Sequence, residues 1–429
     1  MRTIIKNGHV LNPSTNMDGM YDVVIEDGII AAVSENVTPA DGDQVISAEG
    51  KYVMPGFIDL HVHFREPGFE YKETIKTGAM AAARGGYTSV CPMPNTNPVI
   101  DSKEMVEWLK KKEIEESVIH ILPVGAVTKG QIGQDLADMK GMAEAGAVAV
   151  SEDGKSVMDI LVYVEGMKQA KENNLVVLAH CEDKSLVRGG VMNEGPKAKE
   201  LGLKGITNAV EDVITARDIF LANETGAKLH LCHCSTKDSV ALIKMAKDAG
   251  YQVTGEVCPH HFTLADEDIP CDDSNYKMNP PLRSKADVQA LKDGLKNGIM
   301  DVISTDHAPH GAEEKSKSMA ASPFGIVGVE TAFALTVTEL VEQGYLTKMQ
   351  LVEKMSYNPA CVLGIDKGQL AEGKAADIVI ADFEESYTTD VSKFASKGKN
   401  TPFDGKQVKG RIYKTLVDGN VVYDYEKEV

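Results

Sequence analysis

The sequence predicts an α/β protein, a (β/α)8 barrel of the TIM type joined to a small β-sandwich domain built from both chain termini. Eight apolar strand-like segments alternate with eight helical segments between residues 57 and 343. Short alternating strands fill the two terminal segments, and each end has too few of them to form a core alone. The structural alternative is a doubly wound open sheet, but no Gly-rich phosphate loop follows the first strand of the repeat.

Length and composition set the domain plan. A chain of 429 residues with 43% hydrophobic and 25% charged residues is globular and too long for one ordinary core. We therefore expect a sandwich from residues 1–54 and 366–429 and a barrel from residues 55–365. The net charge of −19 makes nucleic acid and anionic membranes poor partners. Seven scattered cysteines, no signal peptide and no membrane-length apolar run favour the cytoplasm.

The terminal segments alternate between apolar and polar residues, as strands do. At the N-terminus the expected strands are Arg2–Lys6, Tyr21–Glu26, Ile29–Val33, Gln44–Ser47 and Tyr52–Met54. At the C-terminus they are Ala376–Asp382, Gly410–Val417 and Val421–Tyr423. The polar stretch Glu384–Gly405 is expected to be a loop. We expect the two ends to pair into one small domain beside the barrel.

The barrel is expected to contain eight strand–helix units, with glycine just after several of the helices. The expected strands are Phe57–Phe64, Thr88–Met93, His120–Val127, Ala147–Glu152, Leu175–His180, Lys228–His233, Gln252–Val257 and Asp301–Thr305. The expected helices are Lys72–Arg84, Lys103–Glu115, Gln134–Ala145, Ser156–Glu172, Asn208–Glu224, Lys237–Ala249, Lys285–Lys296 and Val329–Gln343, with a last helix at Lys348–Met355.

The first barrel strand carries the start of a candidate site. Alternation places Phe57, Asp59, His61, His63 and Arg65 on one face. The two imidazoles are about 7 Å apart along the strand, which suits two ligands of one metal ion. Arg65 follows on the same face and could hold a carboxylate. The alternative, two histidines that only bond each other, is disfavoured because matching partners occur downstream.

Chemistry in a barrel sits at the carboxyl ends of its strands. The polar residues at those ends are His61, His63, Arg65, Asn95, Asp153, His180, His233, His260, His261, Asp306 and His310. Four of the histidines and the two aspartates suit zinc, and six ligands are too many for one tetrahedral ion. Two metal ions bridged by a carboxylate would use all six.

Neighbouring residues have less decided roles. Because Cys232 and Cys234 alternate with His233, we expect both cysteines to face the helix layer. Several other polar residues could either orient a ligand imidazole through a hydrogen bond or have an ordinary structural role. Those left open are Asp59, Lys155, Glu182, Asp183, His260 and His261, whereas His9, His120 and His230 are expected to be structural.

Four motifs together resemble the dihydroorotases of the amidohydrolase superfamily. They are PGFIDLHVHFR at 55–65, MPNTNP at 93–98, MNPPLR at 278–283 and TDHAPH at 305–310. The His-x-His signature alone marks only the superfamily. Its combination with Arg65, the asparagines and the last motif is much more specific, and the resemblance runs along nearly the whole chain.

The resemblance implies a zinc enzyme that reversibly cyclises N-carbamoyl-L-aspartate to L-dihydroorotate and water in pyrimidine biosynthesis. The implied ligands are His61, His63 and Asp306 for one zinc ion, His180 and His233 for a second, and Asp153 for both. The implied substrate-binding residues are His63, Arg65, Asn95, Asn279, His310, Phe324 and Gly325. The implied partners are a second copy of the chain and aspartate carbamoyltransferase.

One departure from the superfamily concerns the bridging ligand. Many members use a carbamylated lysine at the end of the fourth strand, where this chain has Asp153, as in the bacterial subgroup that it resembles. Lys155 shares the alternation phase of Asp153, but Gly154 between them favours a turn.

The hypothesis for the mechanism assigns proton transfer to Asp306. In ring opening it would accept the proton of the attacking hydroxide and return it to the leaving nitrogen. Arg65 and Asn95 would fix the substrate carboxylate. The segment Gly311–Ser322 has no clear period, and we expect a mobile loop that closes on substrate; the alternative is a surface loop without function.

Two other functions are weighed against this one. A hydantoinase or allantoinase would use the same metals without needing a carboxylate clamp, so Arg65 and Asn95 argue against it. A catalytically inactive dihydroorotase-like assembly subunit would be expected to lack metal ligands, whereas all six positions are filled here.

Overall fold

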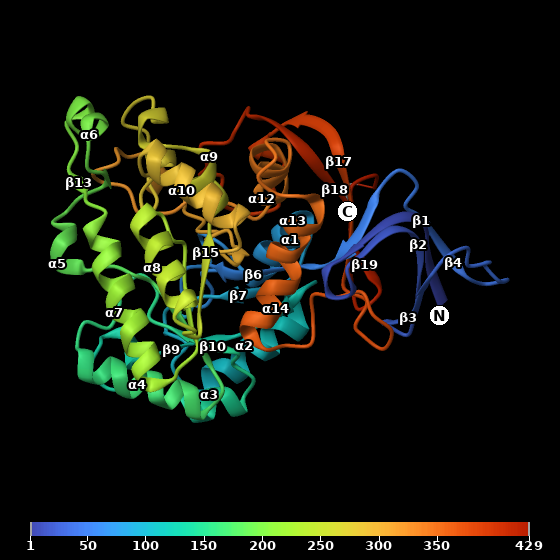
Figure 1. The fold of residues 1–429 in the computed structure, drawn as a ribbon, viewed down its shortest axis with the longest axis horizontal. Coiled ribbons are helices and arrows are strands. Elements are labelled where there is room, and N and C mark those ends of the chain that lie inside the picture. Colours follow the sequence, from blue (N-terminus) through green and yellow to red (C-terminus); the bar gives the residue numbers. More distant parts are fainter. Residues whose placement is uncertain (1, 428–429) are drawn as a thin grey trace.

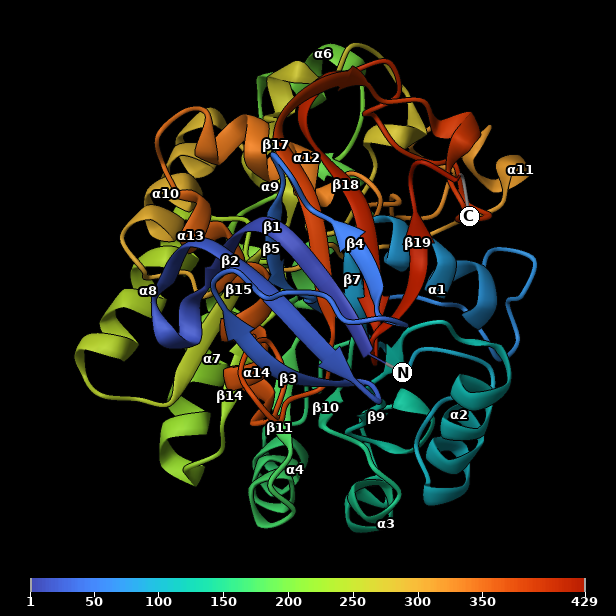
Figure 2. The same cartoon turned by 90° about the vertical axis from the view of Figure 1, so that its right-hand side faces the viewer.

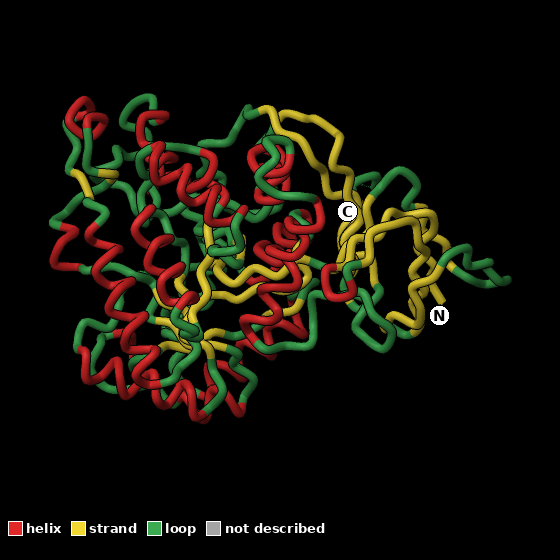
Figure 3. Tube along the Cα trace, in the orientation of Figure 1, coloured by secondary structure: helices red, strands yellow, loops and turns green. Residues whose placement is uncertain are grey.

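The computed structural model describes residues 2–427 and has two parts (Figure 1). One is a barrel in which helices surround the strands, and the other is a β-sheet region that contains both chain ends (Figure 3). The predicted fold class is confirmed. No helix in residues 2–427 is long and apolar enough to cross a membrane.

Parallel strands form the barrel wall. They are β6 (Phe57–Val62), β7 (Tyr87–Pro92), β8 (His120–Ile121), β9 (Val124–Ala126), β10 (Ala149–Ser151), β11 (Val176–Ala179), β14 (Leu229–Leu231), β15 (Val253–Val257) and β16 (Val302–Ile303). The third predicted strand, His120–Val127, is wrong as one element because it breaks between β8 and β9 at Pro123. Proline has no N–H to donate to a ladder, so a strand commonly breaks there.

The seam between the first and last strands is closed by side chains as well as backbone. Val62 pairs in parallel with His307, and the His63 amide donates to the His307 carbonyl (2.8 Å). The Asp59 carboxylate accepts from the Thr305 amide (3.1 Å) and hydroxyl (2.6 Å). Burial raises the pKa of Asp59 to about 7. Asp59 is therefore a buried, hydrogen-bonded carboxylate that fastens the seam, one of the two roles weighed for it.

The predicted outer helices are present, although some are shorter. They are α1 (Ile75–Arg84), α2 (Lys103–Glu116), α3 (Met139–Glu144), α4 (Ile160–Glu172), α7 (Ala209–Thr225), α8 (Lys237–Asp248), α10 (Lys285–Lys296) and α12 (Ala332–Thr336). The prediction for Gln134–Ala145 is wrong in its first part, because the Asp138 side chain caps a helix that begins only at Met139. The last helix, α13 (Lys348–Val352), continues through a π-helical turn into α14 (Asn358–Leu363).

Short elements that periodicity did not predict lie among the connections after the strands. They are α5 (Lys184–Val187), β12 (Met192–Asn193), α6 (Pro196–Leu201), β13 (Gly205–Ile206), α9 (Pro259–Thr263) and α11 (Ala312–Lys315). None exceeds six residues, so their sequences show no repeating pattern to detect.

The terminal strands form one sheet in the order β19-β18-β17-β5-β1-β2-β3, with β4 beside β1. Their bounds are β1 (Arg2–Asn12), β2 (Met17–Glu26), β3 (Ile29–Ser34), β4 (Gln44–Ser47), β5 (Tyr52–Pro55), β17 (Ile378–Thr388), β18 (Gln407–Val417) and β19 (Asn420–Asp424). The antiparallel pair β5–β17 joins the two chain ends, as predicted. The loop predicted at Glu384–Gly405 is wrong for its first residues, because β17 continues to Thr388. The boundaries 1–54, 55–365 and 366–429 stay a prediction.

Successive side chains of β17 point to opposite faces, one toward the core of the terminal sheet and the next toward the barrel core. Ile378 and Ile380 pack in the core of the terminal sheet, whereas Val379 and Phe383 belong to the barrel core. There the Phe383 ring lies 5.2 Å from that of Phe333 on α12. One strand thus serves both hydrophobic cores, and it holds the sheet beside the barrel helices (Figure 2).

Candidate active site

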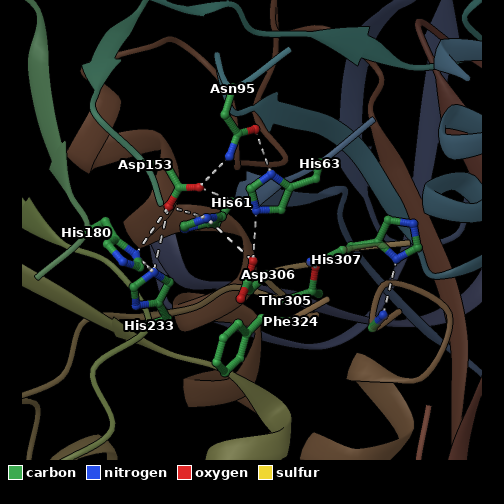
Figure 4. Close-up of polar contacts among 12 residues, drawn as sticks. His61, His63, Asn95, Asp153, His180, His233, Thr305, Asp306, His307 and Phe324 are labelled. Atoms are coloured by element: carbon green, nitrogen blue, oxygen red, sulfur yellow. Dashed lines mark hydrogen bonds and ion pairs between the residues drawn. The ribbon is translucent and has the colours of Figure 1, made fainter. Parts of the chain in front are cut away.

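The residues predicted as metal ligands lie together beyond the carboxyl ends of the strands (Figure 4). They are His61, His63, Asp153, His180, His233 and Asp306, and all are buried. His61 Nε2 is 3.3 Å from Asp153 Oδ1 and 3.6 Å from Asp306 Oδ1. Asp153 Oδ1 also lies 3.5 Å from His180 Nδ1 and 3.8 Å from His233 Nε2. Asp153 therefore stands between the two pairs of histidines.

The backbone turns sharply where the chain delivers several of these side chains. Arg65, His233 and Asp306 have φ values of 61°, 36° and 48°, in the left-handed region that such residues rarely adopt. Strain of this kind persists only where the surrounding structure enforces it, and it gathers at functional sites.

The turn at His233 also overturns the expectation for Cys232. Cys234 packs outward, since it lies beside Gly255 and Ile243 of the helix-facing core. Cys232 instead lies within 4.8 Å of His61 and Glu256 inside the barrel. Because the left-handed turn breaks strict alternation, His233 reaches the centre although its neighbour Cys232 already points inward.

Asn95 fixes the orientation of the His63 ring. Its Nδ2 donates to Asp153 Oδ2 (2.9 Å), so its Oδ1 accepts from His63 Nδ1 (3.1 Å). With the proton on Nδ1, the lone pair of His63 lies on Nε2. That nitrogen is 3.1 Å from Asp306 Oδ1, another acceptor.

His61 shows the same arrangement. Its Nδ1 faces the Glu256 carboxylate at 3.3 Å, which leaves the lone pair on Nε2, turned toward Asp153 and Asp306. Neither ring nitrogen of this fully buried residue makes a well-aligned hydrogen bond within residues 2–427. On the other side, His180 Nδ1 and His233 Nε2 lie 2.9 Å apart.

The carboxylates respond strongly to these neighbours. Burial alone would raise the pKa of Asp306, but His61 and His63 hold it well below its usual range. Burial opposes ionisation of Asp153 as well, and His61 and His233 hold its pKa far below the ordinary value. Both groups are therefore carboxylates at neutral pH.

With neutral rings, acceptors would face acceptors across the centre of the site, so the cluster needs positive charge. Against the effect of burial, Asp153 and Asp306 raise the pKa of His61 well above its usual value, and either that proton or a bound cation supplies the charge. Imidazole nitrogens and carboxylate oxygens are the donors that zinc prefers. Three of the residues, His61, His63 and Asp306, have ligand atoms within 4.8 Å of one another, as do His61, Asp153 and His233. The residues present therefore fit a metal site.

A chain of hydrogen-bonded polar residues, here called the second arm, extends from this centre through Arg65 and His310 to Lys72. Arg65 Nε donates to the Pro309 carbonyl (3.2 Å), and its Nη2 lies 3.3 Å from His310 Nε2. His310 Nε2 donates to the Phe324 carbonyl (2.8 Å), so its Nδ1 accepts from Lys72 Nζ (3.3 Å). Burial, and then Arg65 and Lys72, lower the pKa of His310 to about 2, which keeps the ring neutral.

Two predicted substrate-binding residues remain, Asn279 and Gly325. Asn279 Nδ2 donates to Glu182, whose carboxylate lies 3.7 Å from His180 Nε2. Gly325 follows Phe324, and its φ of 130° and the Ala308 contact leave no room for a side chain.

Comparisons with known proteins agree with this geometry. The family model described as Dihydro-orotase-like matches residues 50–239. A dihydroorotase from Acetivibrio thermocellus is 48% identical over 421 residues, and one from Pelotomaculum thermopropionicum is 51% identical over 422 residues. Each alignment covers 98% of this chain and 98% of the relative. The chain belongs to the dihydroorotase family.

A solved structure supports the fold of this dihydroorotase family member. The L-hydantoinase (dihydropyrimidinase) from Arthrobacter aurescens matches it with a TM-score of 0.89 and 27% identity. The match covers 98% of this chain and 96% of that one. The sequence-based identification as a dihydroorotase-type cyclic amidohydrolase is confirmed, since the identity to dihydroorotases is much higher and equally complete.

Sequence reasoning missed two residues of this dihydroorotase site. Glu256 on β15 faces His61, and its other oxygen lies 3.0 Å from His230 Nε2, while its Oε1 accepts from the His233 amide (3.1 Å). Glu256 is the one charged residue in the strand β15, and its inward phase is a signal that could have found it. Lys72 lies in a loop, where no periodicity points to it.

The structure assigns contacts to most residues whose roles were left open. Glu182 faces His180, one of the predicted ligands, whereas Asp183 caps α5 as an ordinary loop carboxylate. His261 Nε2 donates to the Pro280 carbonyl (2.9 Å), next to Asn279. The remaining histidines have other surroundings: His260 is buried with Nε2 unpaired within residues 2–427, and His9, His120 and His230 pair with carboxylates. Gly154 makes the predicted turn, which leaves Lys155 half-buried.

The segment Gly311–Ser322 begins with a short helix and continues as turns. It contains α11, and buried Lys315 donates to the carbonyls of Lys277 (3.3 Å) and Pro323 (3.2 Å). Its closure on substrate stays a prediction.

Proposed function

We propose that this chain catalyses the reversible cyclisation of N-carbamoyl-L-aspartate to L-dihydroorotate with loss of water. Membership of the dihydroorotase family supports this reaction. The observation that carries the proposal is the convergence of four imidazoles and two carboxylates beside an arm that ends in Arg65 and His310. One group of residues fits metal ions, and the other fits an anionic substrate.

We infer that the site takes two zinc ions. The proposed ligands are His61, His63 and Asp306 for one ion, His180 and His233 for the other, and Asp153 for both. When bound, such ions polarise a carbonyl group and make a water molecule acidic enough to supply hydroxide at neutral pH.

Asp306 is the proposed proton carrier. In ring opening, the water oxygen forms a bond to the amide carbonyl carbon of dihydroorotate, and Asp306 takes the proton that this oxygen loses. When the carbon–nitrogen bond breaks, Asp306 gives the proton to the nitrogen of the ureido group, and the new carboxyl group releases the second water proton to solvent as it ionises. Asp306 is ionised before the reaction begins, because its pKa is held well below its usual range, so it is in the protonation state that a base requires. Cyclisation runs the same steps in reverse.

Substrate binding is assigned to the second arm. We propose that Arg65 and Asn95 hold the carboxylate, with His63 and His310 beside it, and that Asn279 and the Phe324–Gly325 backbone bind the ring amides. The guanidinium supplies paired donors that match a carboxylate. His310 stays neutral, so it adds a directed hydrogen bond rather than a second charge.

An assay of three substrates tests this proposal against its nearest alternatives. Purified enzyme is offered dihydroorotate, hydantoin and allantoin at equal concentrations. We expect kcat/KM for dihydroorotate to exceed the others at least a hundredfold, and Arg65→Met to reduce that advantage. Preferred turnover of hydantoin or allantoin would indicate another cyclic amidase. No turnover of any substrate with zinc supplied would support the inactive assembly subunit.

We propose further that the enzyme acts in the cytoplasm as a homodimer and associates with aspartate carbamoyltransferase. The resemblance to the family supports these expectations. Light scattering on the purified chain, alone and mixed with aspartate carbamoyltransferase, tests both associations.

A further inference from the structure

A cavity of about 440 Å³ lies between the barrel helices and the terminal sheet. Its walls come from the end of α1, from α12 and from β17, β18 and β19, which lie side by side in Figure 2. None of the proposed metal or substrate ligands lines it. Its volume is in the range of sites that hold small organic molecules.

Two arginines offer unused donors to this cavity. The Arg411 guanidinium lies 3.8 Å from the ring centre of Tyr387 and 4.4 Å from that of Tyr425, and its Nε donates to Glu385. Arg84 donates through Nε to Glu330 (2.9 Å). Within residues 2–427, the two terminal nitrogens of each guanidinium group make no hydrogen bond. Each arginine can therefore donate two parallel hydrogen bonds to a ligand from this free edge.

Two acids line the cavity, and both have hydrogen-bond donors of their own: Asp390 accepts from the amide (3.0 Å) and hydroxyl (2.6 Å) of Ser392, and Glu330 is held by Arg84. Besides Arg84, the buried Glu330 carboxylate accepts hydrogen bonds from the amides of Ala395 (3.0 Å) and Ser396 (3.1 Å). Exposed Lys393 adds a cation that has no ion pair in the described part of the chain. Together with the aromatic walls, this surplus of donors favours a ligand that is both anionic and planar.

We propose that this cavity binds a small aromatic anion, a carboxylate or phosphate on a ring, and that its occupancy alters substrate binding at the active site. The anionic group pairs with the free edges of Arg84 and Arg411, and the ring lies against Phe333 and the tyrosines. The second half of the inference rests on the proposed function.

The connection to the active site is a short, hydrogen-bonded segment, residues 393–400. Its first residues line the cavity, and the next two bond Glu330. Asn400 at its end accepts from the His310 amide (3.0 Å) and donates to the carbonyls of Ala308 (3.1 Å) and Gly325 (3.0 Å). A ligand anion on the free edge of Arg84 draws the guanidinium away from Glu330, which alters the bonds from Glu330 to this segment and therefore the position of the substrate-binding loop.

Calorimetry with benzoate, phenyl phosphate and inorganic phosphate tests the binding site, since spatial proximity alone does not establish coupling. We expect benzoate or phenyl phosphate to bind with a Kd of about 1 mM or tighter, and inorganic phosphate at least tenfold more weakly. Arg411→Met and Arg84→Met should each weaken binding at least tenfold. Lys393→Glu, an exposed change that spares the fold, should weaken it at least threefold. Lys409→Met is the matched control, because Lys409 on β18 pairs with Glu342 and Glu384 outside the cavity and should leave the Kd unchanged.

Kinetic measurements test the coupling. Whichever ring compound binds in calorimetry is added to the zinc-loaded enzyme, and KM is measured with and without it. We expect KM for dihydroorotate to change at least threefold in the wild type and in Lys409→Met, and to stay constant in Arg411→Met. Absence of saturable binding, equal binding to the cavity variants, or an unchanged KM would overturn the inference. Calorimetry needs no turnover, so its failure is distinguishable from failure of the proposed reaction.

Discussion

The mouth of the barrel and its junction with the terminal sheet bury polar groups in opposite ways. At the mouth, the imidazoles of His61 and His63 crowd against the carboxylates of Asp153 and Asp306, and left-handed backbone places Asp306. At the junction, the buried carboxylate of Asp377 lies between the His120 ring and the Lys367 ammonium group, which both reach its oxygens. The comparison shows that the mouth is arranged for chemistry at a cost in stability, which the well-paired regions offset. Changes at the mouth should therefore alter catalysis, and changes at the junction should alter stability.

The largest effect is expected for Asp306→Asn. An amide cannot take up the proton of the attacking water, so kcat should fall by about 10²- to 10⁴-fold while substrate binding changes little. Stopped assays of ring opening, together with calorimetric titration of dihydroorotate, measure both quantities. Turnover near the wild-type value would remove Asp306 from its proposed role.

Glu256→Gln should have the next largest effect. The carboxylate orients His61 and holds the His233 amide, so its loss should lower zinc affinity or activity about 10- to 100-fold. Glu339→Gln is the control, since Glu339 pairs with Lys292 and Lys406 away from the mouth. Equal zinc affinity and activity in both variants would mean that Glu256 only supports the fold.

Asp377→Asn tests the junction. Burial alone would raise the pKa of Asp377, but the hydrogen bond to His120 and the charge of Lys367 lower it to about 2. Because the folded-state pKa lies below the unfolded one, the ionised group stabilises the fold above pH ~4, and this stability is lost as the pH falls through about 2. The variant should lose about 2 kcal/mol of unfolding free energy at pH 7, with kcat unchanged.

Urea unfolding at pH 7 and at pH 3 measures this contribution. The difference between variant and wild type should shrink at the lower pH. Asp366→Asn removes the exposed partner of Lys374 and should leave the stability unchanged. A loss of activity in Asp377→Asn without a loss of stability would contradict the division between the two regions.

Lys72→Met is expected to have the smallest effect, confined to binding. Without the ammonium group, Nδ1 of His310 loses its donor, so KM should rise about tenfold while kcat changes less. Lys76→Met on the exposed side of α1 controls for the loss of one positive charge. If both variants raise KM equally, long-range charge rather than the His310 contact would explain the result.

Periodicity alone was enough to predict the barrel, the joining of the chain ends and the residues at each strand end. Alternation failed where the backbone leaves the extended conformation, as at His233, whose left-handed φ invalidated the orientation inferred for Cys232. Pro123 was a visible signal that the third strand would break.

Contacts between distant segments were out of reach for such reasoning. The Asp59 bonds to Thr305 and the Lys72 contact to His310 join residues more than 200 positions apart. Glu256 could have been found, because a lone carboxylate in the inward phase of a buried strand needs a partner. The cluster of six predicted ligands was accessible because each of them lies at or near the end of a strand that the pattern had defined.

The most direct test of the account is the zinc content of the purified chain, measured by mass spectrometry together with activity on N-carbamoyl-L-aspartate at mildly acid pH. The account predicts two zinc ions per active chain, loss of activity on chelation, its return with zinc, and one ion fewer in His180→Ala. An active enzyme that carries no metal, or a wild-type zinc content in His180→Ala, would contradict it.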